Sequence, residues 1–141
     1  QFSKWKNLDD INADKLKADQ LMQYDLLILG APTWFDGELP DYWDEMVPAI
    51  EDLNLSGKKI AIFGNGDQVG YPENFGDAVG LLADVFESTG AKIVGQTQIN
   101  GYKFESSKAI EEGMFRGLIL DFENQQQRNK SRIQGWLDSF D

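Results

Sequence analysis

The 141-residue sequence contains neither cysteine nor histidine. Without cysteine, the chain supplies no disulfide, no thiolate nucleophile and no thiolate ligand for an iron–sulfur cluster. Without histidine, it lacks the commonest general base and the commonest metal ligand, which argues against a catalytic triad. We therefore expect any chemistry to belong to a bound cofactor rather than to side chains.

Long apolar runs are also missing. No stretch approaches the roughly 18 residues that a membrane span requires, so we expect a cytoplasmic protein that does not bind membranes. Acidic residues outnumber basic ones by 24 to 13, which gives a formal charge of −11. Such a charge repels nucleic acid and anionic membranes and favours partners with basic docking faces. Acidity that only keeps the protein dissolved is the alternative, and charge alone does not decide between the two.

Short apolar runs alternate with amphipathic segments, which is typical of a parallel sheet covered by helices on both faces. The first two runs are continuous enough to predict strands that are buried on both faces. We predict strands at Asp25–Gly30, Lys58–Gly64, Ala91–Thr97 and Phe115–Leu120, and an edge strand near Lys4–Leu8. The lack of repeats and linkers indicates one α/β domain over residues 1–141.

Helix signals fall between these strands. The predicted helices are a surface helix over Asn12–Gln20 capped by Asn12, one beginning at Pro40 and kinked or shortened by Pro48, one capped by Asn74 and ended by Gly90, and a last helix from about Gln126 to Phe140. The polar segment Gln98–Met114 is expected to be irregular.

Two loops contain the residues that suggest a site. Ala31–Leu39 and Asn65–Tyr71 leave the carboxyl ends of strands that should be neighbours, so they should face each other across a crevice. Trp34 and Tyr71 then hold a planar ring between them, and such stacking adds about 0.5–1.5 kcal/mol to area burial. The alternative is that the rings cover the core and the loops only form turns. The two loops together favour a site.

The same loops are rich in glycine and carboxylates. Glycines let the backbone approach a ring closely, and the carboxylates disfavour an anionic reduced state of a redox ring, which lowers its midpoint potential. The glycines are Gly37, Gly64, Gly66 and Gly70, and the acidic residues are Asp36, Glu38, Asp67 and Glu73.

Several motifs, in this order, resemble the long-chain flavodoxins. They are PTW at Pro32–Trp34, GEL at Gly37–Leu39, FGNGDQVGYPENF at Phe63–Phe75, GYKFESSKA at Gly101–Ala109 and FRGLILDFENQ at Phe115–Gln125. The segment Gln98–Met114, which splits the last strand, marks the long-chain branch. The resemblance implies a flavodoxin-like doubly wound five-stranded parallel sheet of order 2-1-3-4-5. It also implies FMN as the cofactor and a low-potential one-electron carrier rather than an enzyme.

The resemblance carries over to individual positions. Trp34 matches the inner ring-stacking residue and Tyr71 the outer one. The Phe35–Asp36 peptide falls where the redox-linked backbone turn of the family meets flavin N5, and after a flip the Phe35 carbonyl would accept the N5–H bond. The other matches are Pro32 and Thr33 leading into the ring site (Thr33 on the phosphate or ribityl side), Asn65, Gly66 and Asp67 at the pyrimidine edge, Asn74 and Asp77 close to that loop, and Glu123 near the flavin rim.

The chain departs from the family pattern at its start. The N-terminal strand and the loop that holds the FMN phosphate at a helix N-terminus have no counterpart here. In the family order that strand lies in the middle of the sheet, and each buried unpaired backbone group costs about 1–3 kcal/mol against a total stability of about 5–15 kcal/mol. We therefore expect roughly 20–30 residues, one strand plus one helix, to precede Gln1 or to come from another chain. With that segment present we expect a monomer.

The implied partners are redox proteins with basic faces, namely a reductase of the NADP-dependent type and low-potential acceptor enzymes. Two other functions stay open at this point. One is an FMN domain of a larger reductase. The other is an interaction protein that kept the fold and lost the cofactor with its phosphate loop. Flavin absorbance near about 370 and 450 nm separates the carriers from the last of these.

Overall fold

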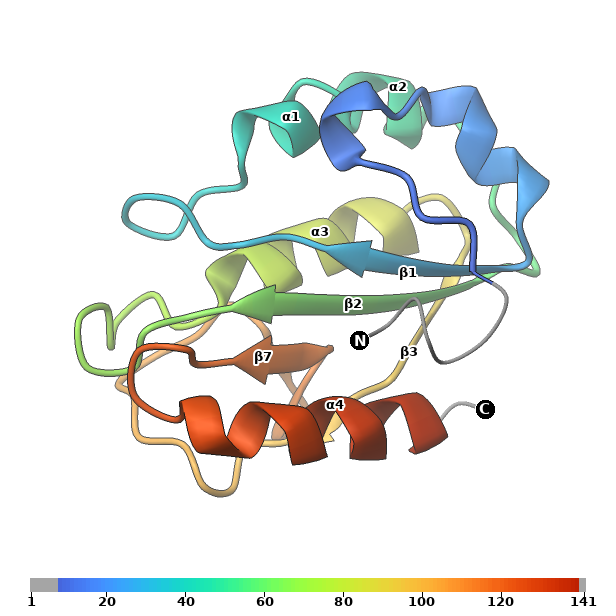
Figure 1. Ribbon diagram of the computed structural model, residues 1–141. Helices are drawn as coiled ribbons and strands as arrows, with labels where there is room; N and C mark the ends of the chain where they lie inside the picture. Colours follow the sequence, from blue (N-terminus) through green and yellow to red (C-terminus); the bar gives the residue numbers. More distant parts are fainter. Residues whose placement is uncertain (1–7, 140–141) are drawn as a thin grey trace.

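A parallel sheet of four strands forms the centre of the computed structural model, which describes residues 8–139 (Figure 1). Strand β1 (Leu26–Gly30) pairs in parallel with β2 (Lys59–Asn65), in a register that runs from Leu26 opposite Lys59 to Gly30 opposite Phe63. Two short strands, β3 (Lys92–Val94) and β7 (Leu118–Leu120), pair with successive parts of β2. Since β2 residues in both parts also pair with β1, β3 and β7 lie on the same opposite edge. The predicted interruption of the last strand is confirmed.

The segment between β3 and β7 is more regular than predicted. It contains a small antiparallel sheet of order β4-β6-β5, made of Thr97–Gln98, Met114–Phe115 and Ile110–Glu111. The expected strand Phe115–Leu120 breaks at Gly117, where a Cβ atom would lie 2.1 Å from the Ile62 carbonyl oxygen. Stacked and edge-on rings then pack this segment onto the core, with ring centroids of Phe75 and Phe104 5.2 Å apart.

Helices cover the two faces of the sheet. Helix α3 (Asp77–Glu87) shares one buried cluster with Ile60 and Ile62 of β2. Helix α4 (Gln126–Ser139) shares the other cluster with Ala61, on the opposite face, as the twofold alternation of a strand requires (Figure 1). Burial of β2 on both faces is therefore confirmed, and α4 begins at the predicted residue. Phe140 lies outside the described residues.

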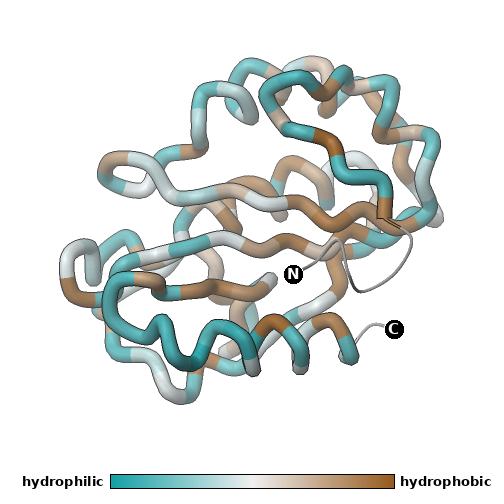
Figure 2. The backbone as a smooth tube through the Cα atoms, viewed as in Figure 1, coloured by the Kyte–Doolittle hydropathy of each residue, from teal (hydrophilic) through white to brown (hydrophobic). Residues whose placement is uncertain are grey.

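Strand β1 differs from the prediction. Leu27 and Leu29 are buried against α3, but Leu26 and Ile28 on the other face are only half-buried, so burial on both faces is wrong for this strand. The cause is the placement of α4, which packs over β7 and β2 and leaves β1 partly open. Figure 2 shows apolar residues along much of β1 and in the middle of β2. Within the described residues β1 has a single sheet partner, and the predicted edge strand falls outside them except for Leu8.

Turn chemistry explains the remaining helices. Pro48 sits in the first turn of α2 (Val47–Glu51), separate from α1 (Asp41–Asp44), so the predicted shortening is confirmed. Near residue 12 the single expected helix is replaced by two 3₁₀ turns, Ala13–Lys15 and Ala18–Gln23. The predicted cap is nevertheless present, because Asn12 Oδ1 accepts a hydrogen bond from the Asp14 N–H.

Asn74 does not cap α3 as predicted. The capping residue is Gly76, at φ 65°, and a Cβ atom there would lie 2.2 Å from Ile119 Cδ1. Only glycine fits this backbone and this contact, which moves the start of the helix beyond Asn74. No helix in the described 8–139 range is long and apolar enough to cross a membrane.

Candidate functional site

Three loops meet at one end of the sheet. The first (residues 31–39) follows β1, the second (residues 65–71) begins with the last residue of β2, and the third (residues 121–125) follows β7. Because these strands are parallel neighbours, their carboxyl ends share one rim, and Figure 1 shows the first two loops extending beyond the same end of the sheet. We call these segments loop one, loop two and the rim loop.

Loop one is a tight turn with strained backbone. The Trp34 N–H donates to the Glu38 carbonyl at 2.9 Å and the Glu38 N–H returns a bond to the Trp34 carbonyl at 2.7 Å. Between them Phe35 has φ 51°, which is uncommon for a residue other than glycine, and Gly37 has φ 99°. Within the described residues, the Phe35–Asp36 peptide makes no backbone hydrogen bond. Its N–H and C=O are available to a ligand.

Ring contacts fix the indole of Trp34. Its ring meets Tyr42 edge-on at 5.8 Å between centroids and Phe35 at 6.3 Å. The neighbouring helix is tied to the strand end, because Trp43 Nε1 donates to the Gly30 carbonyl at 3.0 Å. The half-buried indole is thus held in one orientation, while the Phe35 ring is 72% exposed. Loop one presents a fixed aromatic face at the rim.

Loop two is shaped by Asp67. Its Oδ1 accepts hydrogen bonds from the Val69 N–H at 3.1 Å and the Gly70 N–H at 2.8 Å, and its carbonyl accepts the Tyr71 N–H at 2.9 Å. The bond from Gly70, and then one from the Asn124 side chain, holds the pKa of Asp67 below its usual range. The Tyr71 ring is 52% exposed and can stack on a ligand. Gly66 is required here, since a Cβ atom would lie 2.8 Å from the Phe75 ring.

The side chains of three predicted site residues, Thr33, Asn74 and Asp77, form hydrogen bonds within the protein. Thr33 Oγ1, expected on the phosphate or ribityl side, accepts the Ala78 N–H at 3.2 Å at the start of α3. Asp77 is buried and accepts the Lys108 N–H at 2.7 Å and the Asn74 side-chain amide at 3.1 Å. These side chains tie the loops to α3 and to the segment before β5. The structure therefore gives them a supporting position.

The remaining predicted residues lie at the rim. Asp36 is exposed on loop one and Asn65 is exposed at the end of β2, and Pro32 and Gly66 are half-buried. Glu123 is exposed on the rim loop, where its N–H donates to Asp121 Oδ1 at 3.1 Å. The third loop thus contributes an acidic side chain to the same edge.

Sequence reasoning missed Gln68, Asp121 and Asn124, which connect loop two to the rim loop. The Gln68 side chain donates to Asp121 Oδ2 at 2.8 Å, and the Asn124 amide lies 2.8 Å from Asp67 Oδ1. The signal for Asp121 was its place directly after a buried strand, followed by an asparagine three residues on, which is typical of a side-chain-stabilised turn. Its partner Gln68 lies 53 residues earlier in the chain, and no pattern in the sequence predicts that the two side chains meet.

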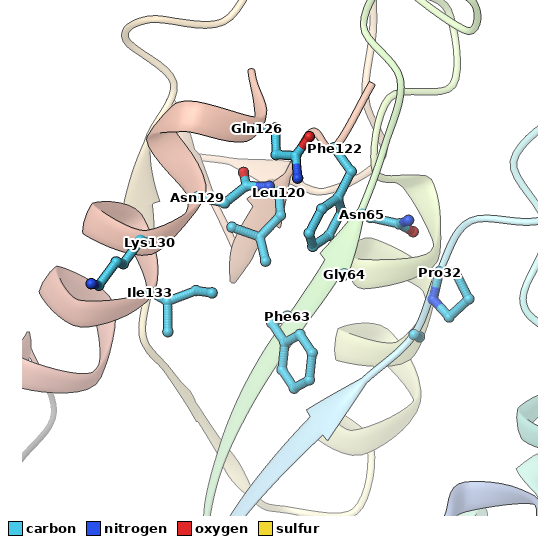
Figure 3. Close-up of a pocket in the computed structure, with 11 residues that line it drawn as sticks. Pro32, Phe63, Gly64, Asn65, Leu120, Phe122, Gln126, Asn129, Lys130 and Ile133 are labelled. Atoms are coloured by element: carbon cyan, nitrogen blue, oxygen red, sulfur yellow. The ribbon is translucent and has the colours of Figure 1, made fainter. Parts of the chain in front are cut away.

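A cavity of about 530 Å³ opens beside the loops, between the ends of β1 and β2 and helix α4. Pro32 and Asn65 belong to both the cavity and the rim. Figure 3 shows Asn129 and Ile133 reaching from α4 toward Leu120, with Phe63 and Pro32 on the opposite side. The Asn129 amide is 5% exposed, and neither its nitrogen nor its oxygen has a hydrogen-bond partner within the described part of the chain.

Comparison with known proteins identifies the family. The family model described as Flavodoxin matches residues 3–136. The chain is 46% identical over 132 residues to a flavodoxin of Synechococcus elongatus, covering 93% of this chain and 76% of the relative. It is 40% identical over 124 residues to Flavodoxin 1 of Escherichia coli, covering 87% and 70%. The chain therefore spans about three quarters of the length of these relatives.

A solved structure of a flavodoxin supports the same family. The crystal structure of Fusobacterium nucleatum flavodoxin bound to flavin mononucleotide matches with a TM-score of 0.84 and 33% identity, over 86% of this chain and 73% of that chain. The loops at the carboxyl rim of this sheet thus belong to a fold that binds FMN in that relative. The chain belongs to the flavodoxin family.

Proposed function

We propose that this protein is an FMN-binding one-electron carrier that passes low-potential electrons between redox proteins and is not itself an enzyme. The observation that supports this most directly is the rim, where loop one carries an oriented Trp34 and a backbone peptide with unused hydrogen-bonding groups, and loop two carries an exposed Tyr71. Membership in the flavodoxin family supports the same assignment. We also propose the long-chain type, which rests on the segment between β3 and β7.

The residues present suit the ring half of FMN. Trp34 and Tyr71 would hold the two ring faces, and the Phe35–Asp36 peptide would bond to one ring edge. The backbone of Asn65, Gly66 and Asp67 would hold the pyrimidine edge, with Pro32 and Glu123 at the border of the site and Thr33, Asn74 and Asp77 supporting the loops. When bound, FMN accepts and donates electrons one at a time, and the protein supplies orientation and electrostatics.

Carboxylates at the rim set the electrostatics. Asp36 and Glu38 lie on loop one, Asp67 on loop two, and Asp121 and Glu123 on the rim loop. Asp67 and Asp121 are both held in the ionised form by hydrogen bonds, since their pKa values lie below the usual range. Fixed negative charge opposes the addition of further negative charge to a ring held there, so these groups favour a low reduction potential.

The phosphate half of FMN requires donors other than the start of α3. There the Ala78 N–H is already bonded to Thr33, and Asp77 adds a carboxylate that would repel a phosphate. We propose that the sheet of this single domain is completed beside β1 by a strand from outside the described residues, followed by the phosphate-binding loop. The single sheet partner of β1 within residues 8–139 supports this proposal.

The proposed partners are a reductase of the NADP-dependent type and low-potential acceptor enzymes with basic faces. The charge of −11 supports such partners through long-range attraction. A cytoplasmic location is part of the same proposal and rests on the resemblance to the family. Transfer from a purified reductase should therefore slow as ionic strength rises, because salt screens the attraction.

Riboflavin and FMN together provide the decisive experiment. Riboflavin carries the ring without the phosphate, so quenching of its fluorescence tests Trp34 and Tyr71 independently of any phosphate-binding loop. We expect quenching, flavin absorbance bands near about 370 and 450 nm, and stepwise one-electron reduction with a chemical donor. A protein that quenches neither flavin would contradict the carrier assignment and favour a cofactor-free interaction protein. Turnover of a small substrate without a partner protein would instead favour an enzyme domain.

A further inference from the structure

We propose that Asp121 is a positioning residue for the flavin site: its buried carboxylate, acting through Gln68 and Asn124, fixes the conformation in which loop two presents Tyr71. This inference rests on the proposed function, because the consequence of the positioning is flavin affinity. Asp121 lies on the rim loop after β7 and is not one of the ring-contacting positions.

Asp121 is fully buried, and the hydrogen bonds that its carboxylate accepts within residues 8–139 come from loop two and the rim loop. Its Oδ2 accepts the backbone N–H of Gln68 at 3.1 Å and the side-chain amide of Gln68 at 2.8 Å. Its Oδ1 accepts the Glu123 N–H at 3.1 Å and the Asn124 N–H at 2.9 Å. One carboxylate thus joins loop two to the rim loop.

Gln68 extends this connection to a third segment. Its side chain is 5% exposed, and while its amide nitrogen donates to Asp121, its Oε1 accepts the Lys103 N–H at 2.6 Å. The donor and acceptor ends of the amide are therefore used by different partners. Loop two, the rim loop and the segment between β4 and β5 meet at this one side chain.

Asn124 connects Asp121 to the turn that carries Tyr71. Its amide nitrogen lies 3.0 Å from Asp121 Oδ2 and 2.8 Å from Asp67 Oδ1. The same Asp67 oxygen accepts the Val69 and Gly70 N–H groups. A continuous hydrogen-bonded path therefore runs from the buried carboxylate to the residue before Tyr71.

Loop two has little else to hold it. Val69 is 73% exposed and Tyr71 is 52% exposed, so apolar burial contributes little to the conformation of its tip. Polar groups in a buried network are held strongly when all are satisfied and are costly when one is lost. Burial alone would raise the pKa of Asp121, but the bonds from Asn124 and Gln68 outweigh it and lower that pKa, so the acceptor stays ionised at neutral pH.

An acceptor-to-donor exchange tests the proposal. Asp121→Asn places an NH₂ group among five nitrogen donors, while Gln68→Glu combined with Asp121→Asn restores one donor–acceptor match between the two side chains. Asp84→Asn, an exposed carboxylate of α3 paired with Arg116, is the control. We measure riboflavin affinity by fluorescence quenching, and hydrogen exchange of the Val69 and Gly70 amides in the flavin-free protein.

We expect Asp121→Asn to weaken riboflavin binding at least tenfold and to speed exchange of the two loop amides at least tenfold. The double variant should return both to within about threefold of the parent, and the control should change neither. Affinity and exchange both unchanged in Asp121→Asn would overturn the proposal, as would a double variant no better than the single. If Asp121→Asn fails to fold, Asn124→Ala at its exposed position replaces it, with the same two expected changes.

The two readouts separate this inference from the proposed function. A parent protein that binds no riboflavin contradicts the flavin assignment. In that case the exchange of the Val69 and Gly70 amides still decides whether Asp121 positions the loop.

Discussion

Replacement of Tyr71 by alanine is the sharpest test of the ring site. An aromatic side chain buries about 150–250 Å² when covered, and Tyr71 is 52% exposed, so on the order of 100 Å² is available to a ligand. If a flat ring covers about half of that area, burial contributes about 1.2 kcal/mol at about 25 cal/mol per Å². Stacking adds about 0.5–1.5 kcal/mol. A loss of about 1.7–2.7 kcal/mol corresponds to riboflavin binding about 20- to 90-fold weaker.

The same substitution should barely change the free energy of unfolding of the flavin-free protein. The exposed ring packs against little of the core, so we expect a change within about 0.5 kcal/mol by chemical denaturation. Met22→Ala, which removes a half-exposed apolar side chain from the turn before β1, at the other end of that strand from loop one, serves as the control and should leave riboflavin affinity nearly unchanged. Retention of affinity within threefold in Tyr71→Ala would refute the stacking role, and an equal loss in Met22→Ala would show that the effect is not specific.

Three further predictions follow from other residues. Gly66→Ala forces a methyl group against the buried Phe75 ring at 2.8 Å and should lower the free energy of unfolding by about 1–3 kcal/mol in a urea titration; an unchanged free energy would show that glycine is not required there. The pKa values of Asp67 and Asp121 are lowered in the folded protein, so their contribution to stability is present above the ordinary aspartate pKa of about 3.9 and is lost as the pH falls through the lower folded values. Hydrogen exchange of the loop-two amides, measured against pH, should show this loss. Asp121→Asn should reduce the pH dependence of that exchange. Asn129→Leu replaces a buried amide that has no hydrogen-bond partner within residues 8–139. The free energy of unfolding, measured by chemical denaturation, should stay unchanged or rise by about 1 kcal/mol. A loss of that size would show that another group forms a hydrogen bond with this amide.

The hydrophobic pattern was enough to predict the four central strands and the interruption of the last one. Continuous runs such as Ile60–Phe63 leave few alternatives, and the parallel arrangement follows from the helices between them. The pattern did not predict that one face of β1 is half-exposed, because that depends on where α4 lies rather than on the strand itself. The start of α3 was also wrong, since the contact between Gly76 and Ile119 that fixes it joins residues far apart in sequence.

Some features of the candidate site could likewise be predicted from the sequence, and others could not. The aromatic and glycine positions of the two loops carry local signals, and the parallel register brings those loops to one rim. Thr33, Asn74 and Asp77 also had signals, but their side-chain partners depend on how α3 packs beneath the loops. The network through Gln68 and Asp121 spans 53 residues of chain, and a single sequence contains no measure of such distances.

The way β2 holds both halves of a divided strand makes their register independent of the length of the segment between them. Val94 lies opposite Ala61 and Leu118 lies opposite Phe63, so each half takes its alignment from the same neighbour and not from the other half. Residues can therefore be gained or lost between them without shifting any side chain to the wrong side of the sheet.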